Sequence, residues 1–155
     1  MSEIDNLLVE ALNSELEAKK FYNDASEKAK SQAGKNLFSE LADFEQNHYE
    51  RVKKIIESRS SQIDIKSENL QDVKKINSEI EGEFEPNKDE IVTVINMAID
   101  AEKKAQERYT KIADMIEDNE SKIIFQNLAL EEKNHQRILE DEFYHLSNKG
   151  TIIWE

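Results

Sequence analysis

The sequence predicts an all-α fold, a four-helix bundle, from three observations. Glycine and proline are scarce in the 155-residue chain, at three and one residues, and abundant Glu, Lys, Leu and Ala are typical of long helices. Apolar residues recur every three to four positions, the spacing of one helix face. Two segments also match each other at a constant offset of 87 residues; for example, Glu15 in the first segment corresponds to Glu102 in the second. We expect one domain, residues 1–155, because this length buries a sufficient core.

The first half of the chain predicts a helical hairpin over about residues 3–58. Its first helix extends to about residue 30 and its second begins at about residue 35. The connection contains Gly34, and so short a connection makes consecutive helices antiparallel neighbours. The core-facing apolar positions of the two helices are Ile4, Leu8, Ala11, Ala18, Tyr22 and Ala25, then Phe38, Leu41, Val52 and Ile55.

The second half predicts another hairpin, over about residues 87–147. Its first helix begins at Asn87, a candidate N-cap that follows a proline. Its second helix begins at about residue 119, and Gly150 follows it as a stop signal. His145 lies off the apolar stripe of this helix, so we expect it at the surface.

Two segments lie outside the hairpins. The crossover of residues 59–86 is longer than an ordinary loop, and we expect a short helix near residues 68–79. The second and third helices run parallel in such a bundle, which requires a long crossover. This linker is long enough to reach back along its own bundle or across to a partner, so exchange of hairpins between two chains is left open. We expect a homodimer. The tail, residues 148–155, should pack on the bundle end or on a dimer partner through Ile152, Ile153 and Trp154.

Four glutamates interrupt the apolar stripes, one in each helix. Each hairpin has one lone glutamate and one Glu-x-x-His, in the order Glu15, Glu45 and His48, then Glu102, Glu132 and His135. Residues i and i+3 share a helix face, so each Glu-x-x-His directs an oxygen and a nitrogen toward one point. Lone buried carboxylates are costly, and two divalent cations would cancel the charge of four. The six residues therefore predict a dinuclear metal centre of Fe or Mn, which Zn can also enter.

Composition limits the partners and the compartment. The net charge of −13 argues against nucleic acid and anionic membranes as partners, because both are bound mainly through Lys and Arg. The chain has no cysteine, which excludes disulfides and thiolate metal sites within it. No apolar run approaches the roughly 20 residues of a membrane span, and no signal peptide is visible at the start. We expect a cytoplasmic protein.

The repeated motif resembles the rubrerythrin branch of the ferritin-like superfamily. The pattern Glu-x-x-Ala-x-x-x-Tyr from Glu15, followed by Glu45-x-x-His48 and the repeat of both, covers nearly all of the two hairpins. The resemblance implies a di-iron centre in which Glu45 and Glu132 bridge the two ions. It assigns Glu15, Glu45 and His48 to one iron and Glu102, Glu132 and His135 to the other. It also implies that Tyr22 and Tyr109 hydrogen-bond ligand carboxylates from the far side.

The chain departs from that family pattern in two respects. Without cysteine it has no rubredoxin module, so electrons must come from an external donor such as a rubredoxin-like protein. Rubrerythrins place an additional glutamate where this chain has Ala105, and one iron moves toward that glutamate during peroxide turnover. The remaining six ligands resemble a bacterioferritin centre, but Gln46 stands where bacterioferritin has its haem-ligating methionine, so no haem is implied.

Three functions fit these observations. The first is a di-iron oxidoreductase that reduces hydrogen peroxide, with dioxygen as an alternative oxidant, using an external electron donor. The second is a ferroxidase that handles or stores iron. The third is a non-enzymatic bundle that binds metal, such as Zn, for structural purposes. Iron turnover with an oxidant, or formation of a multi-subunit shell, would discriminate among them.

Overall fold

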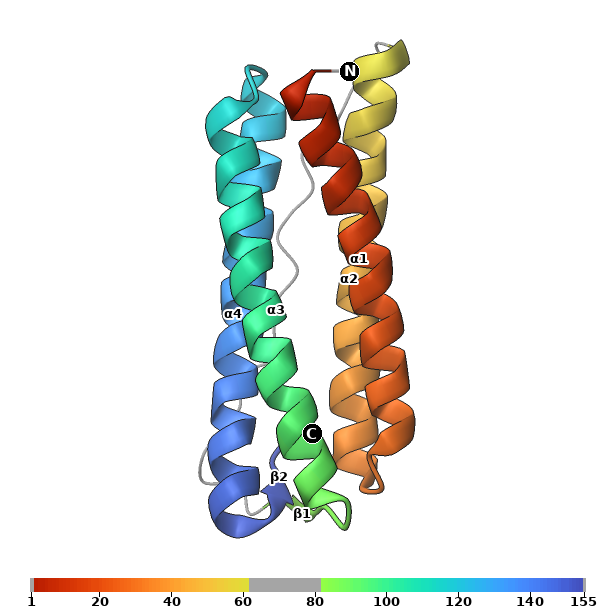
Figure 1. Ribbon diagram of the computed structural model, residues 1–155, viewed down its shortest axis with the longest axis vertical. Helices are drawn as coiled ribbons and strands as arrows, with labels where there is room; N and C mark the ends of the chain where they lie inside the picture. The colour runs from red at the N-terminus through yellow and green to blue at the C-terminus, as the bar shows by residue number, and fades with distance from the viewer. Residues whose placement is uncertain (1, 62–81, 155) are drawn as a thin grey trace.

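The computed structural model describes residues 2–61 and 82–154. Figure 1 shows an elongated bundle of helices, which confirms the predicted all-α four-helix architecture. The short helix expected near residues 68–79 lies outside the described residues. The elements in chain order are α1 (Glu3–Lys28), α2 (Gln32–Ser61), β1 (Glu83–Phe84), α3 (Lys88–Met115), α4 (Asn119–Lys149) and β2 (Thr151–Ile152).

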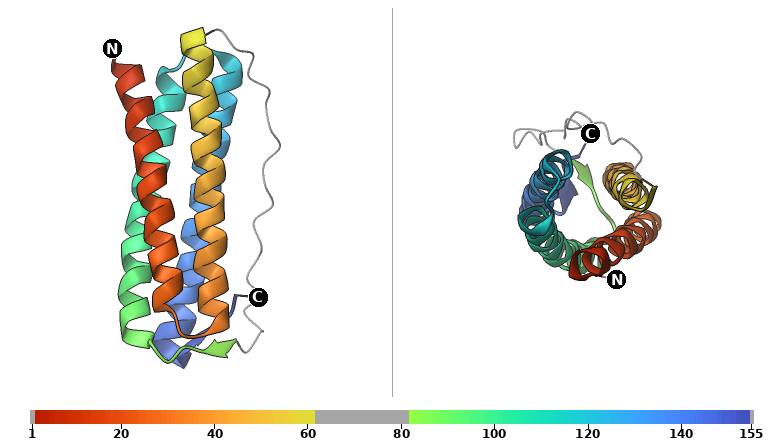
Figure 2. Two further views of the ribbon diagram at one scale, coloured as in Figure 1. Left: turned by 90° about the vertical axis from the view of Figure 1, so that its right-hand side faces the viewer. Right: turned by 90° about the horizontal axis from the view of Figure 1, so that it is seen from above.

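The helices form two antiparallel hairpins, α1 with α2 and α3 with α4 (Figure 1). Helices α2 and α3 run in the same direction, as expected of a bundle whose hairpins are joined by a long crossover. Viewed from above in Figure 2, the four helices surround a common interior. The hairpins meet mainly along α1 and α3, so each hairpin supplies half of the interior.

Local capping explains several helix ends. Ser2 and Asp5 form a reciprocal capping box at the start of α1. The Asp118 carboxylate accepts the backbone N–H of Ser121, at 2.9 Å, at the start of α4. Helix α4 ends at Gly150, whose φ of 71° is the left-handed conformation that glycine adopts without steric cost. The predicted stop at this glycine is confirmed.

The N-cap predicted for α3 is only partly correct. Helix α3 does begin directly after Asn87, but the side chain of this residue makes no capping hydrogen bond to the helix backbone. Its amide nitrogen instead donates to the Lys28 carbonyl at 2.9 Å and to the Glu90 carboxylate at 3.0 Å. Asn87 therefore links the start of α3 to the end of α1.

Helix α2 begins at Gln32, earlier than predicted, and Gly34 lies inside it rather than in a connection. The reason is a pair of carboxylates just before α3, Glu83 and Glu85, which we call the carboxylate clasp. They accept the otherwise unpaired N–H groups at this helix start, with distances of 2.8 to 3.1 Å. The donors are the backbone amides of Lys30, Ser31, Gln32 and Ala33.

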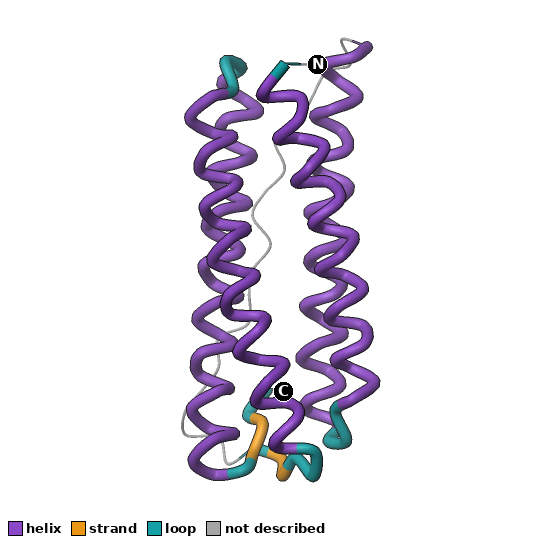
Figure 3. Tube along the Cα trace, in the orientation of Figure 1, coloured by secondary structure: helices purple, strands orange, loops and turns teal. Residues whose placement is uncertain are grey.

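The two strands lie together at one end of the bundle (Figure 3). They pair antiparallel, with Glu83 opposite Ile152, and were not predicted because two-residue strands leave no periodic pattern. The tail from β2 onward packs on this end of the bundle, where Ile152, Ile153 and Trp154 are buried. The Trp154 indole N–H donates to the Glu40 carboxylate of α2, so the tail also contacts the first hairpin.

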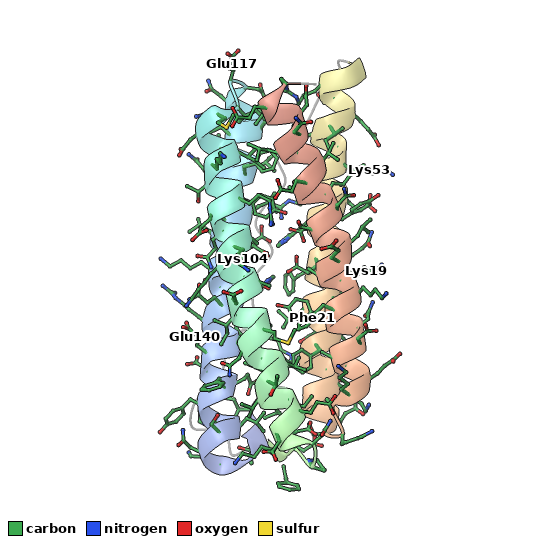
Figure 4. The ribbon with its side chains drawn as sticks, in the orientation of Figure 1. Lys19, Phe21, Lys53, Lys104, Glu117 and Glu140 are labelled. Atoms are coloured by element: carbon green, nitrogen blue, oxygen red, sulfur yellow. The ribbon has the colours of Figure 1, made fainter. Side chains whose placement is uncertain are left out.

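The buried apolar side chains form two clusters along the bundle. One cluster, which includes Phe38, Ile95 and Leu139, lies toward the strands, and the other, which includes Leu8 and Phe125, lies toward the opposite end. Charged side chains such as Lys53 and Glu140 project outward (Figure 4). Among the described residues, no helix is long and apolar enough to cross a membrane.

The surface position predicted for His145 is wrong. This side chain is only 5% exposed, and no hydrogen-bond partner for its Nδ1 lies among the described residues. The prediction assumed that α4 is covered only along its inward stripe. Strand β2 also packs against α4, so residues outside the stripe are buried at this end.

Candidate metal centre

All six predicted ligands lie together in the interior of the bundle. Each helix places a glutamate at the same level, and α2 and α4 each add a histidine one turn further on. None of the six is more than 3% exposed. They are Glu15 from α1, Glu45 and His48 from α2, Glu102 from α3, and Glu132 and His135 from α4.

The donor atoms separate into two overlapping groups. One group is Glu15, Glu45, His48 and Glu132, and the other is Glu45, Glu102, Glu132 and His135. Within each group the donor atoms lie within 4.8 Å of one another, close enough to ligate one ion after small adjustments. Because Glu45 and Glu132 belong to both groups, they lie between the two positions. This is the place that bridging carboxylates would occupy.

Both histidines direct the same ring nitrogen toward the carboxylates. His48 Nδ1 lies 3.0 Å from a Glu132 oxygen and 3.5 Å from Glu45. His135 Nδ1 lies 3.3 Å from Glu132 and 3.5 Å from Glu45. Nδ1 is therefore the nitrogen available to a metal in each half, and Nε2 faces the surrounding protein.

Two tyrosines connect the hairpins behind the lone glutamates. Tyr22 on α1 donates its hydroxyl to Glu102 on α3 at 2.5 Å, and Tyr109 on α3 donates to Glu15 on α1. Each tyrosine thus serves the glutamate of the other hairpin rather than its own. Because the bond occupies one carboxylate oxygen, the other oxygen is left for the centre.

The cluster fits a metal pair because most of its inward polar atoms lack partners. Buried polar atoms in proteins are almost always hydrogen-bonded, yet within residues 2–61 and 82–154 these atoms have none. Metal coordination would satisfy the carboxylate oxygens and the two Nδ1 atoms, and oxygen-rich donors with one imidazole per ion suit Fe or Mn. The unpaired atoms are one oxygen each of Glu15, Glu102 and Glu132, both oxygens of Glu45, and both nitrogens of His48 and His135.

Burial and mutual repulsion give the glutamates different pKa values. Burial raises the pKa of Glu15 to about 8, and the Glu45 carboxylate adds to the rise. Burial raises the pKa of Glu102 well above its usual value, with a contribution from Glu132. Burial opposes ionisation of Glu45 and Glu132 as well, but hydrogen bonds and the histidines lower their pKa. Burial thus disfavours the charged forms of Glu15 and Glu102, whereas metal binding requires them, so metal affinity should depend on pH.

Sequence reasoning missed a buried ion pair next to the cluster. The Arg51 guanidinium lies 2.7 Å from a Glu131 carboxylate oxygen, and both side chains are at most 5% exposed. The other Glu131 oxygen lies 3.7 Å from His48 Nε2. The only signal in the sequence was a second glutamate directly before Glu132, which had no counterpart in the other half of the repeat.

A cavity of about 350 Å³ opens beside the cluster, between α1 and α3. Small side chains at Ala18 and Ala105 contribute to its wall, and Phe21, which lies between these helices in Figure 4, lines it as well. Lys104 and Arg108 supply positive charge to the lining. The cavity also touches four of the glutamates, namely Glu15, Glu45, Glu102 and Glu132.

The fold and the cluster together define the class of ferritin-like carboxylate bundles, in which lone glutamates and Glu-x-x-His motifs project inward from four helices. Within this class the chain belongs to the rubrerythrin family, whose model, described as rubrerythrin, matches residues 6–143. The resemblance stated from the sequence is thereby confirmed.

One solved structure is similar over nearly the whole chain. It is a hypothetical protein from Pyrococcus furiosus, with a TM-score of 0.75 and 26% sequence identity. The match covers 94% of this chain and 91% of that one, so the two share the architecture from end to end. No curated protein matches the chain.

Proposed function

We propose that the protein is a di-iron oxidoreductase that reduces hydrogen peroxide with electrons from an external donor, such as a rubredoxin-like protein. The observation that carries the proposal is the pair of overlapping donor groups, in which buried carboxylate and imidazole atoms lack partners. Membership of the rubrerythrin family supports iron as the metal. Dioxygen is the alternative oxidant.

The residues of the chain would hold the two ions and limit the access of water to them. Iron would supply the redox chemistry when bound, because reduction of hydrogen peroxide to two waters takes two electrons, which two Fe²⁺ would give on becoming Fe³⁺, and two protons, which the surrounding water would provide. Glu45 and Glu132 lie where they would bridge the ions, and the tyrosines Tyr22 and Tyr109 orient the terminal glutamates. The two apolar clusters exclude water from either end.

The cavity between α1 and α3 supports a small oxidant as the substrate. Its volume of about 350 Å³ holds peroxide or dioxygen with room to spare, and it reaches the carboxylates directly. Ala105 occupies the position where rubrerythrins carry an additional glutamate, so space rather than a further ligand adjoins the centre. Oxidant would therefore approach the ions from this side.

The same alanine favours a second candidate function, a ferroxidase. With Ala105 the centre would have six protein ligands, three from each hairpin, and position 105 offers no carboxylate toward which an iron could move. Such a centre suits oxidation of incoming Fe²⁺ as well as reduction of peroxide. A structural metal site, filled by Zn, is the third reading.

The experiment that separates these functions is anaerobic loading with two Fe²⁺ per chain, followed by rapid mixing with hydrogen peroxide or with dioxygen. The near-ultraviolet absorbance of carboxylate-bound Fe³⁺ reports oxidation. We expect faster oxidation by peroxide, reversed by a small reductant. Faster oxidation by dioxygen that continues as Fe²⁺ is added would establish the ferroxidase instead. No oxidation by either would leave a structural metal site.

A matched pair of variants on α4 tests the ligand assignment. Glu132→Ala removes a carboxylate that both donor groups share, so we expect loss of the metal pair. Glu140→Ala removes an exposed carboxylate two turns further along the same helix and should bind two Fe²⁺ normally. Full metal occupancy in Glu132→Ala, or in the equivalent Glu45→Ala, would overturn the assignment.

A further inference from the structure

The surroundings of the two histidines break the repeat that relates the two halves. Glu131 has Phe44 as its counterpart 87 residues earlier, and Arg51 has Ile138 as its counterpart 87 residues later. The ligands themselves, and the two tyrosines, are identical in both halves. Any difference between the two metal positions must therefore come from residues around the ligands.

Around His48, the outward ring nitrogen faces a charged pair. Nε2 lies 3.7 Å from one Glu131 oxygen, and the other Glu131 oxygen lies 2.7 Å from Arg51. Arg51 also donates to the Asn47 side chain at 3.3 Å. Nε2 and the facing Glu131 oxygen are both buried and have no closer partner among the described residues. A small rotation of either side chain would join them in a hydrogen bond.

Around His135, the corresponding nitrogen has no such acceptor. Its Nε2 is buried without a hydrogen-bond partner within the described part of the chain. Within residues 2–61 and 82–154, every carboxylate within 4.0 Å of this ring lies on its Nδ1 side. The ring of Phe44 lies nearby instead, with ring centroids 5.0 Å apart and the planes inclined by 60°.

A carboxylate behind a metal-binding imidazole changes how well that imidazole binds. Accepting the Nε2–H fixes the tautomer that leaves Nδ1 free for the metal, holds the ring in place and makes Nδ1 a stronger donor. Arg51 neutralises Glu131, so the acceptor remains ionised while buried. Loss of such an outer partner commonly weakens metal binding by about 10–100-fold.

We propose that the two metal positions are inequivalent, and that the position formed with Glu15 and His48 binds metal first and more tightly. The positioning pair Glu131–Arg51 is the cause. The inference rests on the dinuclear centre proposed above and assigns its order of filling. The position formed with Glu102 and His135 fills second, because Phe44 and Ile138 give its histidine no acceptor.

The test is titration of the metal-free protein with Co²⁺, in which calorimetry and the visible ligand-field spectrum monitor the binding. We expect two steps whose affinities differ by about tenfold or more. Glu15→Ala should abolish the tighter step, whereas Glu102→Ala should leave it in place. Two equal steps in the unaltered protein, or loss of the tighter step in Glu102→Ala instead, would overturn the inference without touching the proposed function.

Variants that exchange the surroundings of the two halves test the cause. Glu131→Phe combined with Arg51→Ile gives His48 the same surroundings as His135. This double variant should weaken the tighter binding step by about 10–100-fold, so that the two steps merge. Phe44→Glu combined with Ile138→Arg gives His135 the surroundings of His48 and should strengthen the weaker binding step. Helicity and melting in chelator monitor folding. Unchanged steps in folded double variants would overturn the role of the pair.

The outcomes separate this inference from the proposed function. Failure of the unaltered protein to bind any Co²⁺ overturns the metal centre itself, and the order of filling with it. Two bound Co²⁺ of equal affinity overturn only the order. If the first double variant does not fold, the comparison of Glu15→Ala with Glu102→Ala still decides which position is tighter.

Discussion

At the scale of single residues, the tyrosines determine how the lone glutamates meet the centre. Tyr22 and Tyr109 occupy one oxygen of Glu102 and Glu15, respectively. Burial raises the pKa of both tyrosines well above its usual value, and the nearby carboxylates add to the rise. The hydroxyls therefore stay protonated and act as donors at any physiological pH.

Removing one of these donors should weaken metal binding. In Tyr109→Phe the buried oxygen of Glu15 loses its hydrogen bond, and we expect about a tenfold loss of affinity for metal, as is typical for outer partners of ligands. Competition between the protein and a chelator for Fe²⁺ under anaerobic conditions measures the change. Tyr144→Phe, at an exposed tyrosine, is the control. Equal affinities in the two variants would contradict the orienting role.

Another residue-scale prediction concerns pH and lies away from the centre. Burial raises the pKa of Glu142 to about 7, although the backbone N–H of Ile153 donates to it at 2.9 Å. The folded state thus favours the protonated acid. Its contribution to stability is full below the ordinary value of 4.5 and is lost as pH rises through about 7.

Glu142→Gln imitates the protonated form, so it should remove this pH dependence. We expect the variant to match the unaltered protein near pH 5 and to exceed its stability near pH 8 by about 2–3 kcal/mol. Urea unfolding of both proteins in chelator at the two pH values measures the difference. Glu140→Gln, on the exposed side of the same helix, should show no such change. A variant less stable than the parent at pH 8 would refute the argument.

At the scale of elements, the carboxylate clasp Glu83 and Glu85 joins the second hairpin to the start of α2. Glu85 is fully buried and accepts the backbone N–H groups of Lys30 and Ser31, the hydroxyl of Ser31, and the backbone N–H of Asn87. It also lies 2.8 Å from where a side chain at Gly34 would begin, so that glycine permits the close approach. The clasp thus ties three helix ends together.

Removal of the buried member of the clasp should be costly. Glu85→Ala leaves several buried donors without an acceptor, and we expect a loss of about 2–4 kcal/mol in unfolding free energy. Glu83→Ala removes the exposed member, which accepts two backbone N–H groups at the start of α2, and should cost about 1 kcal/mol, as is typical of a lost helix cap. Denaturant unfolding with both variants saturated with metal measures the two losses. Equal losses of unfolding free energy in the two variants would show that the burial of Glu85 does not increase its contribution to stability.

The elements also show what the sequence could reveal. The four helices followed from apolar spacing over many turns, which a helix face imposes directly. The early start of α2 and the two short strands could not be predicted from this spacing. Both depend on contacts made by residues 83–85 with segments more than fifty positions away. Local sequence carries no record of such partners.

The candidate centre likewise has residues that the sequence predicted and residues that it did not. Its six donors were predictable because each is a glutamate or histidine in an apolar stripe and each recurs at the 87-residue offset. Glu131 and Arg51 are replaced by other residue types at the 87-residue offset, and His145 lies off the stripe. Their burial arises from packing between helices and with the tail, so no periodic pattern marked them.

At the scale of the whole molecule, metal and folding should be strongly coupled. The ions would bind only the folded arrangement and would relieve repulsion among four buried carboxylates. At metal concentrations of about a thousandfold above the dissociation constant, the gain is roughly 4 kcal/mol, or on the order of 10 °C in melting temperature. Thermal scans with and without chelator measure it. An unchanged melting curve would mean that the glutamates hold no metal.

A single chain brings together all six donors of the centre. Exchange of hairpins between two chains is therefore not required to build it, and the homodimer remains a prediction. Sedimentation at several protein concentrations tests the assembly state. A monomer at every concentration would contradict the predicted dimer.

The crossed bonds from Tyr22 to Glu102 and from Tyr109 to Glu15 bear on the history of this chain. In neither hairpin does the tyrosine donate to the lone glutamate of the same hairpin. Two copies of one hairpin related by a twofold axis would each supply the tyrosine hydroxyl that the other copy's glutamate accepts. Such a self-paired ancestor needs only half the present coding length to hold the same donors. Fusion of two such copies would allow positions such as Glu131 and Phe44 to differ, which a symmetric assembly of identical subunits does not permit.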